Sequence, residues 1–223
     1  MPEGKLIFVP TPIGNLGDIT LRAIEVLRDA DAVGAEDTRK AKILFSKYEI
    51  STPLFSFHVR NERTLSEKVL NRVRKGETVA IISEAGTPGI SDPGYSLIRL
   101  GIAEGLPIEV LPGATALIPA VVLSGFPING FRFEGFLSHT GKGRRRRLRI
   151  LAECKPCTLV FYVSPHRFEV FVADALQILG DRNSVLCREL SKLHEETIRA
   201  RLSKLCEKVG EVRGELVLVI GPE

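Results

Sequence analysis

Thr78-Val-Ala-Ile-Ile-Ser83, followed by Glu84-Ala-Gly-Thr-Pro-Gly-Ile-Ser-Asp-Pro-Gly94, is the stretch of this sequence that decides its fold. The first part is a continuous apolar run, which predicts a strand buried on both faces, as in a parallel sheet covered by helices. The second part is rich in glycine and proline and follows the strand directly. Because ligands of open α/β sheets bind at the carboxyl ends of the strands, this loop is the first candidate for a binding site.

Four more short apolar runs before residue 112 repeat this pattern and alternate with helical spacing. The expected strands lie at 6–9, 32–35, 54–57 and 108–111, and the expected helices at 18–30, 38–48, 64–76 and from 92 onward. A capping box at Thr64 and Glu67 predicts the start of the third helix. Asp92 and Pro93 predict the N-cap and first position of the fourth. Strands that alternate with helices favour a mostly parallel sheet with helices on both faces.

The pattern changes after about residue 125, where crossover helices become fewer. Strands are expected at 131–137, 158–163, 184–190, 196–202 and 214–220, and helices near 142–152, at 166–180 and at 203–209. Fewer crossovers predict a mixed sheet with antiparallel pairs. The expected fold is therefore two α/β domains, residues 1–117 with a mostly parallel sheet and residues 118–223 with a mixed sheet.

The composition excludes several classes of protein. Of the 223 residues, 44% are apolar and 26% are charged, which is ordinary globular usage. No run approaches the roughly 18 apolar residues of a membrane span, and the N-terminus does not resemble a secretory signal. Four cysteines make no disulfide scaffold, and Cys154 and Cys157 without a second pair predict no metal site. We therefore expect a cytoplasmic protein without a membrane partner.

Two further loops share the composition of the loop at 83–94 and also follow expected parallel strands. They are Pro10-Thr-Pro-Ile-Gly-Asn-Leu-Gly-Asp18 and Pro112-Gly-Ala-Thr-Ala116. Glycine lets the backbone approach a ligand, and proline holds a loop in shape. Each loop alone is also typical of a tight turn, but three at one sheet edge favour a small-molecule pocket. The glycine spacing of an ordinary dinucleotide site is absent.

Ala35-Glu-Asp-Thr-Arg39 follows the second strand and carries two adjacent carboxylates. Neighbouring residues of an extended segment point to opposite faces, so Glu36 and Asp37 are not a glycosidase-like pair. Asp37 is expected to cap the next helix. Arg39 then either holds an anion or is an ordinary surface arginine.

Lys142-Gly-Arg-Arg-Arg-Arg-Leu-Arg149 places six positive charges in eight residues, while the whole chain carries only +4, so the rest sums to −2. Positive charge at a helix N-terminus opposes the helix dipole, and phosphates are the natural external compensation. A solvated helix face is the alternative. Arg144, Arg145, Arg146 and Arg147 are the candidate RNA contacts.

Seven motifs in order resemble the tetrapyrrole methylase superfamily, and within it the methyltransferases of small-subunit ribosomal RNA. They are the loops at 9–20, 35–39, 83–94 and 112–116, together with Ser164-Pro-His-Arg167, the stretch 188–196 and the stretch 214–221. The resemblance implies S-adenosyl-L-methionine in a cleft between the two domains, usually in a homodimer. It also implies transfer of a methyl group to the 2′-hydroxyl of a cytidine in 16S rRNA, within the small ribosomal subunit.

The same resemblance implies which residues contact the cofactor. They are Pro12, Gly86, Thr87, Pro88, Gly89, Ile90, Thr115, Ala116, Tyr162 and Cys187. A 2′-hydroxyl is a poor nucleophile, so a general base is expected. Asp37 and Glu36 are the first candidates for that base and His58 the next, with Arg39 holding a phosphate.

Two alternatives to this function remain open at the level of the sequence. One is a methyltransferase that acts on a carbon atom of a tetrapyrrole of the precorrin type, because the superfamily shares its cofactor site. The other is an RNA-binding module without catalysis. The basic run disfavours the first alternative, and the intact loops disfavour the second.

Overall fold

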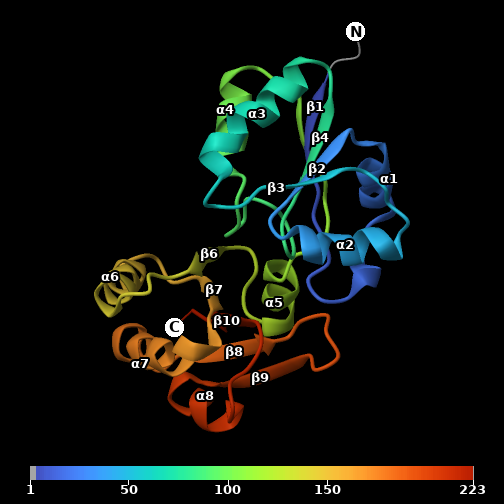
Figure 1. Ribbon diagram of the computed structural model, residues 1–223. Coiled ribbons are helices and arrows are strands. Elements are labelled where there is room, and N and C mark those ends of the chain that lie inside the picture. The colour runs from blue at the N-terminus through green and yellow to red at the C-terminus, as the bar shows by residue number, and fades with distance from the viewer. Residues whose placement is uncertain (1–3, 223) are drawn as a thin grey trace. The chain divides into compact units, whose positions relative to one another are not determined.

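The computed structural model of the chain describes residues 4–222 and shows two compact units that meet in the sequence between Thr115 and Ala116. Each unit contains one five-stranded sheet. We refer to them as the N-terminal and the C-terminal unit (Figure 1).

All strands of the N-terminal sheet are parallel, in the order β3-β2-β4-β1-β5. The strands are β1 (Lys5–Phe8), β2 (Ala32–Ala35), β3 (Leu54–Ser56), β4 (Thr78–Ile82) and β5 (Ile108–Val110). The helices are η1 (Leu16–Asp18), α1 (Leu21–Asp29), α2 (Thr38–Lys47), α3 (Glu62–Arg74) and α4 (Tyr95–Ala103). The parallel sheet predicted from the apolar runs is confirmed.

Helices cover both faces of this sheet, α1 and α2 on one and α3 and α4 on the other (Figure 1). Successive residues of β4 alternate between the two cores: Ala80 packs with α1 and α2, and Ile81 packs with α3 and α4. Because both faces are buried, the strand is apolar throughout.

The C-terminal sheet is mixed, in the order β6-β7-β10-β8-β9. Only the β6–β7 pair is parallel, and the other pairs are antiparallel. The strands are β6 (Phe131–Phe136), β7 (Thr158–Val163), β8 (Asn183–Arg188), β9 (Glu196–Arg201) and β10 (Leu216–Ile220). The helices are α5 (Leu117–Ser124), α6 (Gly141–Ala152), η2 (Pro165–Arg167), α7 (Phe168–Leu179) and α8 (Leu202–Val209). The predicted mixed sheet is confirmed.

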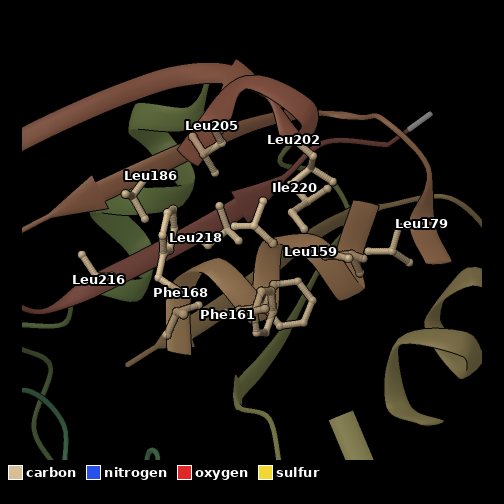
Figure 2. Close-up of a cluster of buried hydrophobic side chains, with 14 of the residues drawn as sticks. Leu159, Phe161, Phe168, Leu179, Leu186, Leu202, Leu205, Leu216, Leu218 and Ile220 are labelled. Atoms are coloured by element: carbon tan, nitrogen blue, oxygen red, sulfur yellow. The ribbon is translucent and has the colours of Figure 1, made fainter. Parts of the chain in front are cut away.

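One face of the mixed sheet packs against α6, α7 and α8 in a single apolar core. Figure 2 shows Leu159, Phe161 and Leu218 of the sheet together with Phe168 and Leu179 of α7 and Leu205 of α8. Helix α5 contacts the sheet at β8 and β10. Helix α5 was not predicted from the sequence, because this short apolar segment lies between Pro-Gly and Ser-Gly turns.

Two predicted helix starts are wrong. Helix α3 begins at Glu62 with Asn61 as its N-cap, so Thr64 and Glu67 form no capping box. Helix α4 begins at Tyr95 after Gly94, whose φ of 134° is accessible mainly to glycine. Pro93 instead closes the preceding loop, because its carbonyl oxygen accepts a hydrogen bond from the Gly89 N–H (3.1 Å). Asp92 therefore lies in the loop, outside any helix.

Candidate active site

The first two glycine–proline loops of the N-terminal unit are joined through their backbones. The Thr11 N–H donates to the Gly86 carbonyl oxygen (2.9 Å), and the Gly86 N–H donates back to the Thr11 carbonyl oxygen (2.8 Å). The Thr11 hydroxyl donates to the carbonyl oxygen of Ser83 (3.2 Å). Gly86 has a φ of 83°, a left-handed conformation that disfavours any other residue. The loop after β1 and the loop after β4 thus form one rigid arrangement.

The third loop joins the same arrangement. The Thr87 hydroxyl donates to the carbonyl oxygen of Ala114 (3.4 Å). A Cβ atom added to Gly113 would lie 2.7 Å from Cβ of Pro10, which is closer than real Cβ atoms approach. The structure therefore brings together the three loops that the sequence analysis selected, at the carboxyl edge of the parallel sheet. Of the predicted cofactor contacts in the first two loops, Pro12, Gly86 and Pro88 are buried, whereas Ile90 is exposed.

Three carboxyl groups gather beside these loops: Glu36 after β2, and Glu84 and Asp92 after β4. Burial, reinforced by the negative charge of Glu84, raises the pKa of Glu36 above its usual value, although the Glu84 N–H donates to its carboxylate. Burial and the charges of Glu36 and Glu84 raise the pKa of Asp92 to about 7, despite a hydrogen bond with the Ser83 hydroxyl. Lys40 forms an ion pair with Glu84. Carboxyl groups with raised pKa values beside a ligand-type loop are typical of catalytic sites.

Sequence reasoning missed Asp92 as a site residue, because Asp-Pro resembles a helix start. The backbone conformation next to Asp92 is a second indication of a functional site. The preceding residue, Ser91, has a φ of 63°, which is uncommon for a residue other than glycine. Such backbone strain is concentrated at functional sites.

Asp37 and Arg39 engage each other. Asp37 is the N-cap of α2, and its Oδ1 accepts from the Arg39 N–H (2.8 Å). The Arg39 guanidinium donates to Asp37 Oδ1 (3.1 Å) and Oδ2 (2.7 Å). These hydrogen bonds hold the pKa of Asp37 well below its usual range. Asp37 is therefore a weak proton acceptor, and Arg39, though exposed, already holds an anion of its own chain.

His58, the third candidate base, follows β3. Its backbone N–H donates to the Asn61 side chain (2.8 Å), which fixes the start of α3. Its Nδ1 is buried and has no hydrogen-bond partner within residues 4–222. Its positive form would lower the pKa of Glu36, which places the imidazole near the carboxyl groups.

Comparison with known proteins identifies the family. The sequence profile of the tetrapyrrole (corrin/porphyrin) methylases matches residues 5–206. A ribosomal RNA small subunit methyltransferase I from Thermotoga maritima is 44% identical over 97% of this chain and 98% of its own length. The chain belongs to the ribosomal RNA small subunit methyltransferase I family. A second such relative, from Halalkalibacterium halodurans, is 43% identical over 98% of this chain and 76% of its own.

Solved structures show that the methyltransferase family shares its fold with enzymes of other names. Uroporphyrin-III C-methyltransferase from Thermus thermophilus, solved in complex with S-adenyl homocysteine, superposes with a TM-score of 0.67 at 22% identity. The superposition covers 98% of this chain and 97% of that one. At this level of identity, the likeness shows the fold alone.

The other predicted cofactor contacts of this methyltransferase family member are divided between the units. Thr115 ends the N-terminal unit and Ala116 begins the C-terminal unit. Tyr162 lies on β7, and the centroid of its ring is 4.9 Å from that of Phe133 and 5.5 Å from that of Phe136. Cys187 is buried on β8, and burial raises the pKa of its thiol to about 11. At neutral pH this thiol is protonated and not nucleophilic.

The basic run forms α6, as the sequence analysis expected, but two of its arginines form ion pairs within the protein. Arg144 is buried and pairs with Asp174 of α7 (2.6 Å), and Arg147 pairs with Glu134 of β6 (2.6 Å). Asp174 also meets Arg145 (3.5 Å). Part of the positive charge of α6 is therefore compensated by carboxylates of the protein itself and not by phosphates.

Two features are absent from the described part of the chain. Residues 4–222 contain no group of three histidine, cysteine, aspartate or glutamate side chains arranged to hold a metal ion. None of the helices in this range is long and apolar enough to cross a membrane.

Proposed function

We propose that this chain transfers the methyl group of S-adenosylmethionine to the 2′-hydroxyl of a cytidine in 16S rRNA of the small ribosomal subunit, in the cytoplasm. One observation carries the choice of substrate: the near-full-length match to relatives named for small-subunit ribosomal RNA. The arrangement of the three loops supports the chemistry, because it joins the segments to which the family resemblance assigns the cofactor.

The residues at the loop edge fit the cofactor. The loops offer the carbonyl oxygen of Gly89, the hydroxyl oxygen of Thr87 and the exposed apolar side chain of Ile90, while Gly86, whose backbone atoms are bonded to Thr11, shapes the loop. When bound, S-adenosylmethionine supplies an electrophilic methyl group on a positively charged sulfur. A sulfonium group bound at this edge would be attracted by Glu36, Glu84 and Asp92 in their ionised forms. Holding the acceptor oxygen at about 3–3.5 Å from the methyl carbon accounts for much of the expected acceleration.

Proton removal from the 2′-hydroxyl falls to the carboxyl groups with raised pKa values. A general base works best when its pKa lies near the operating pH. Glu36 and Asp92 meet this condition better than Asp37, whose pKa Arg39 lowers. We therefore keep Glu36 from the sequence-based candidates, add Asp92, and assign Asp37 to capping α2 and positioning Arg39.

Labelled S-adenosylmethionine tests this function directly. The protein is incubated with small ribosomal subunits lacking the modification, and the label is mapped in the RNA. We expect label on one cytidine ribose. Label on a corrin or porphyrin precursor, or S-adenosylmethionine that never binds, would contradict the proposal. Sedimentation of the same preparation tests the homodimer that the family resemblance implies.

Variants then test the base. Glu36→Gln and Asp92→Asn should each lower single-turnover methyl transfer, by roughly 10²-fold or more for the residue that removes the proton. Asp37→Asn is the matched control. It makes the same chemical change as Asp92→Asn, at the residue that follows Glu36 in the sequence. If Glu36→Gln and Asp92→Asn both retain full turnover with bound RNA, the assignment fails.

A further inference from the structure

The solvent-exposed face of α6 carries three cations, Lys142, Arg146 and Arg149. We propose that these three side chains bind the sugar–phosphate backbone of RNA, whereas Arg144 and Arg147 of the same run hold α6 in place. The inference rests on the proposed function for the identity of the nucleic acid. It divides a run that looks uniform in the sequence into a binding face and a structural face.

The structural face is defined by its ion pairs. The Arg144 side chain is 9% exposed and Asp174 is 12% exposed, and Arg144 Nε also donates to Asp174 Oδ2 (2.7 Å). Glu134, 5% exposed, accepts from Arg147 Nε (2.6 Å) and Nη2 (2.9 Å). Two-bond pairing of this kind uses the guanidinium geometry that a phosphate would need. Arg144 is therefore held inside the protein, and Arg147, whose side chain is 43% exposed, keeps its Nε and Nη2 on Glu134.

Helical geometry separates the two faces. Lys142, Arg146 and Arg149 are spaced i, i+4 and i+7, which puts them on one stripe of the helix. Arg144 shares the opposite side with Leu148 and Leu151, and both leucines are buried in the core of the C-terminal unit. Arg145, half exposed and 3.5 Å from Asp174, flanks the stripe.

The charge of the stripe has no internal counterpart. Within residues 4–222, no ion pair engages Lys142, Arg146 or Arg149, and the nearest acidic residue on the same stripe is Glu153, at the end of the helix. Thr140 already caps the first turn by accepting from the Gly143 N–H (3.2 Å), so the ligand meets side chains and not a free helix end.

A nucleic-acid strand fits this stripe. At about 1.5 Å per residue the three charges extend over about 10 Å, comparable to three nucleotides of a strand that rises roughly 3.4 Å each. The flexible ammonium and planar guanidinium groups suit successive phosphates and read no base. We therefore expect this face to contribute affinity and orientation, and the target nucleotide to be selected elsewhere.

The test is a salt series on RNA binding. Lys142→Gln/Arg146→Gln/Arg149→Gln is compared with the wild type for binding to an unmodified small-subunit rRNA transcript. The slope of log K against log salt should fall in magnitude by about 2, since each single-strand phosphate contact contributes roughly 0.7. Affinity at low salt should fall at least about tenfold. A variant with Lys142→Arg/Arg146→Lys/Arg149→Lys keeps the charges and should restore the slope.

A control variant removes the same charge elsewhere in the C-terminal unit. Lys204, Lys208 and Arg213 are exposed, the first two on α8, and Lys204→Gln/Lys208→Gln/Arg213→Gln should leave the slope unchanged. An unchanged slope in the α6 variant, or an equal loss in the control, overturns the proposal. Binding of S-adenosylmethionine, measured by calorimetry, should be the same in all variants. A wild type that binds RNA through this face without methylating it would refute the proposed function and leave the face standing.

Discussion

Acidic side chains have opposite environments in the two units. Below α6, Asp174 and Glu134 each meet an arginine at 2.6 Å, so buried charge is neutralised pair by pair. At the loop edge of the N-terminal unit, burial and the charge of Glu84 raise the pKa values of Glu36 and Asp92, and Lys40 forms an ion pair with Glu84. The paired carboxylates hold a helix in position, whereas the clustered carboxyl groups repel one another when they are ionised. This contrast separates structural charge from charge available for chemistry.

Breaking the paired arrangement should have the largest effect on stability. Arg144→Met leaves Asp174 buried with only the more distant Arg145, and removing one partner of a buried pair typically costs about 3–5 kcal/mol. The free energy of unfolding in urea measures this cost. Arg144→Met/Asp174→Leu should recover most of it, because an apolar pair needs no compensation. A loss below about 1 kcal/mol, the value of a surface ion pair, would show that the pair is solvated.

Removing the charge of Asp92 from the cluster should have the opposite effect and stabilise the protein. The folded-state pKa of Asp92, about 7, lies above its usual 3.8, so the folded protein binds this proton more tightly than the unfolded chain does. Stability from this group is therefore full at low pH and declines as the pH rises from about 4 to about 7. Asp92→Asn should match the wild type near pH 4 and exceed its Tm at pH 8, by roughly 2–4 °C after solvent screening.

Two outcomes of that experiment would be informative. A gain in Tm at pH 8 together with a loss of methyl transfer is the signature of a residue kept for function at a cost in stability. A variant that is less stable than the wild type at pH 8 would show that Asp92 is a structural residue, and the comparison between the units would fail. Glu134→Gln, which removes a paired carboxylate, should be destabilising at the same pH.

The smallest expected effect concerns the loops that frame the clustered carboxyl groups. Gly113→Ala adds a methyl group that would meet the rigid ring of Pro10, so the loop at 112–116 must move. We expect a decrease of about tenfold in affinity for S-adenosylmethionine, equivalent to about 1.4 kcal/mol. Calorimetric titration measures it, and Gly130→Ala, at a glycine with open space around it and no left-handed φ, is the control for a general glycine effect on stability. Equal affinities in the two variants would separate this loop from the cofactor site.

The fold was predictable because its signals are local. The apolar runs at β2 and β7 carry the strand boundaries that the structure has, and the change in crossover spacing predicted the mixed sheet. The three loops were also predictable, because glycine and proline mark where a parallel strand ends.

The side-chain environment within the site was not predictable to the same degree. Asp92 followed by Pro93 fits a helix start, but the hydrogen bond from the Gly89 N–H to the Pro93 carbonyl oxygen shows that Asp92 lies in a closed loop. Arg144 looks like its neighbours in the basic run. Its partner, Asp174, is 30 residues away, where it is the only charged residue between Val170 and Leu179 of α7. That isolated charge is the one local signal of a buried pair.

The reciprocal bonds between Thr11 and Gly86 use backbone atoms only. These two bonds therefore do not depend on the side chains that line the loops, although the φ of 83° favours glycine at position 86. Substitutions among the lining side chains leave this backbone joint in place. Enzymes named for porphyrin methylation share the fold of this chain at 22% identity or less.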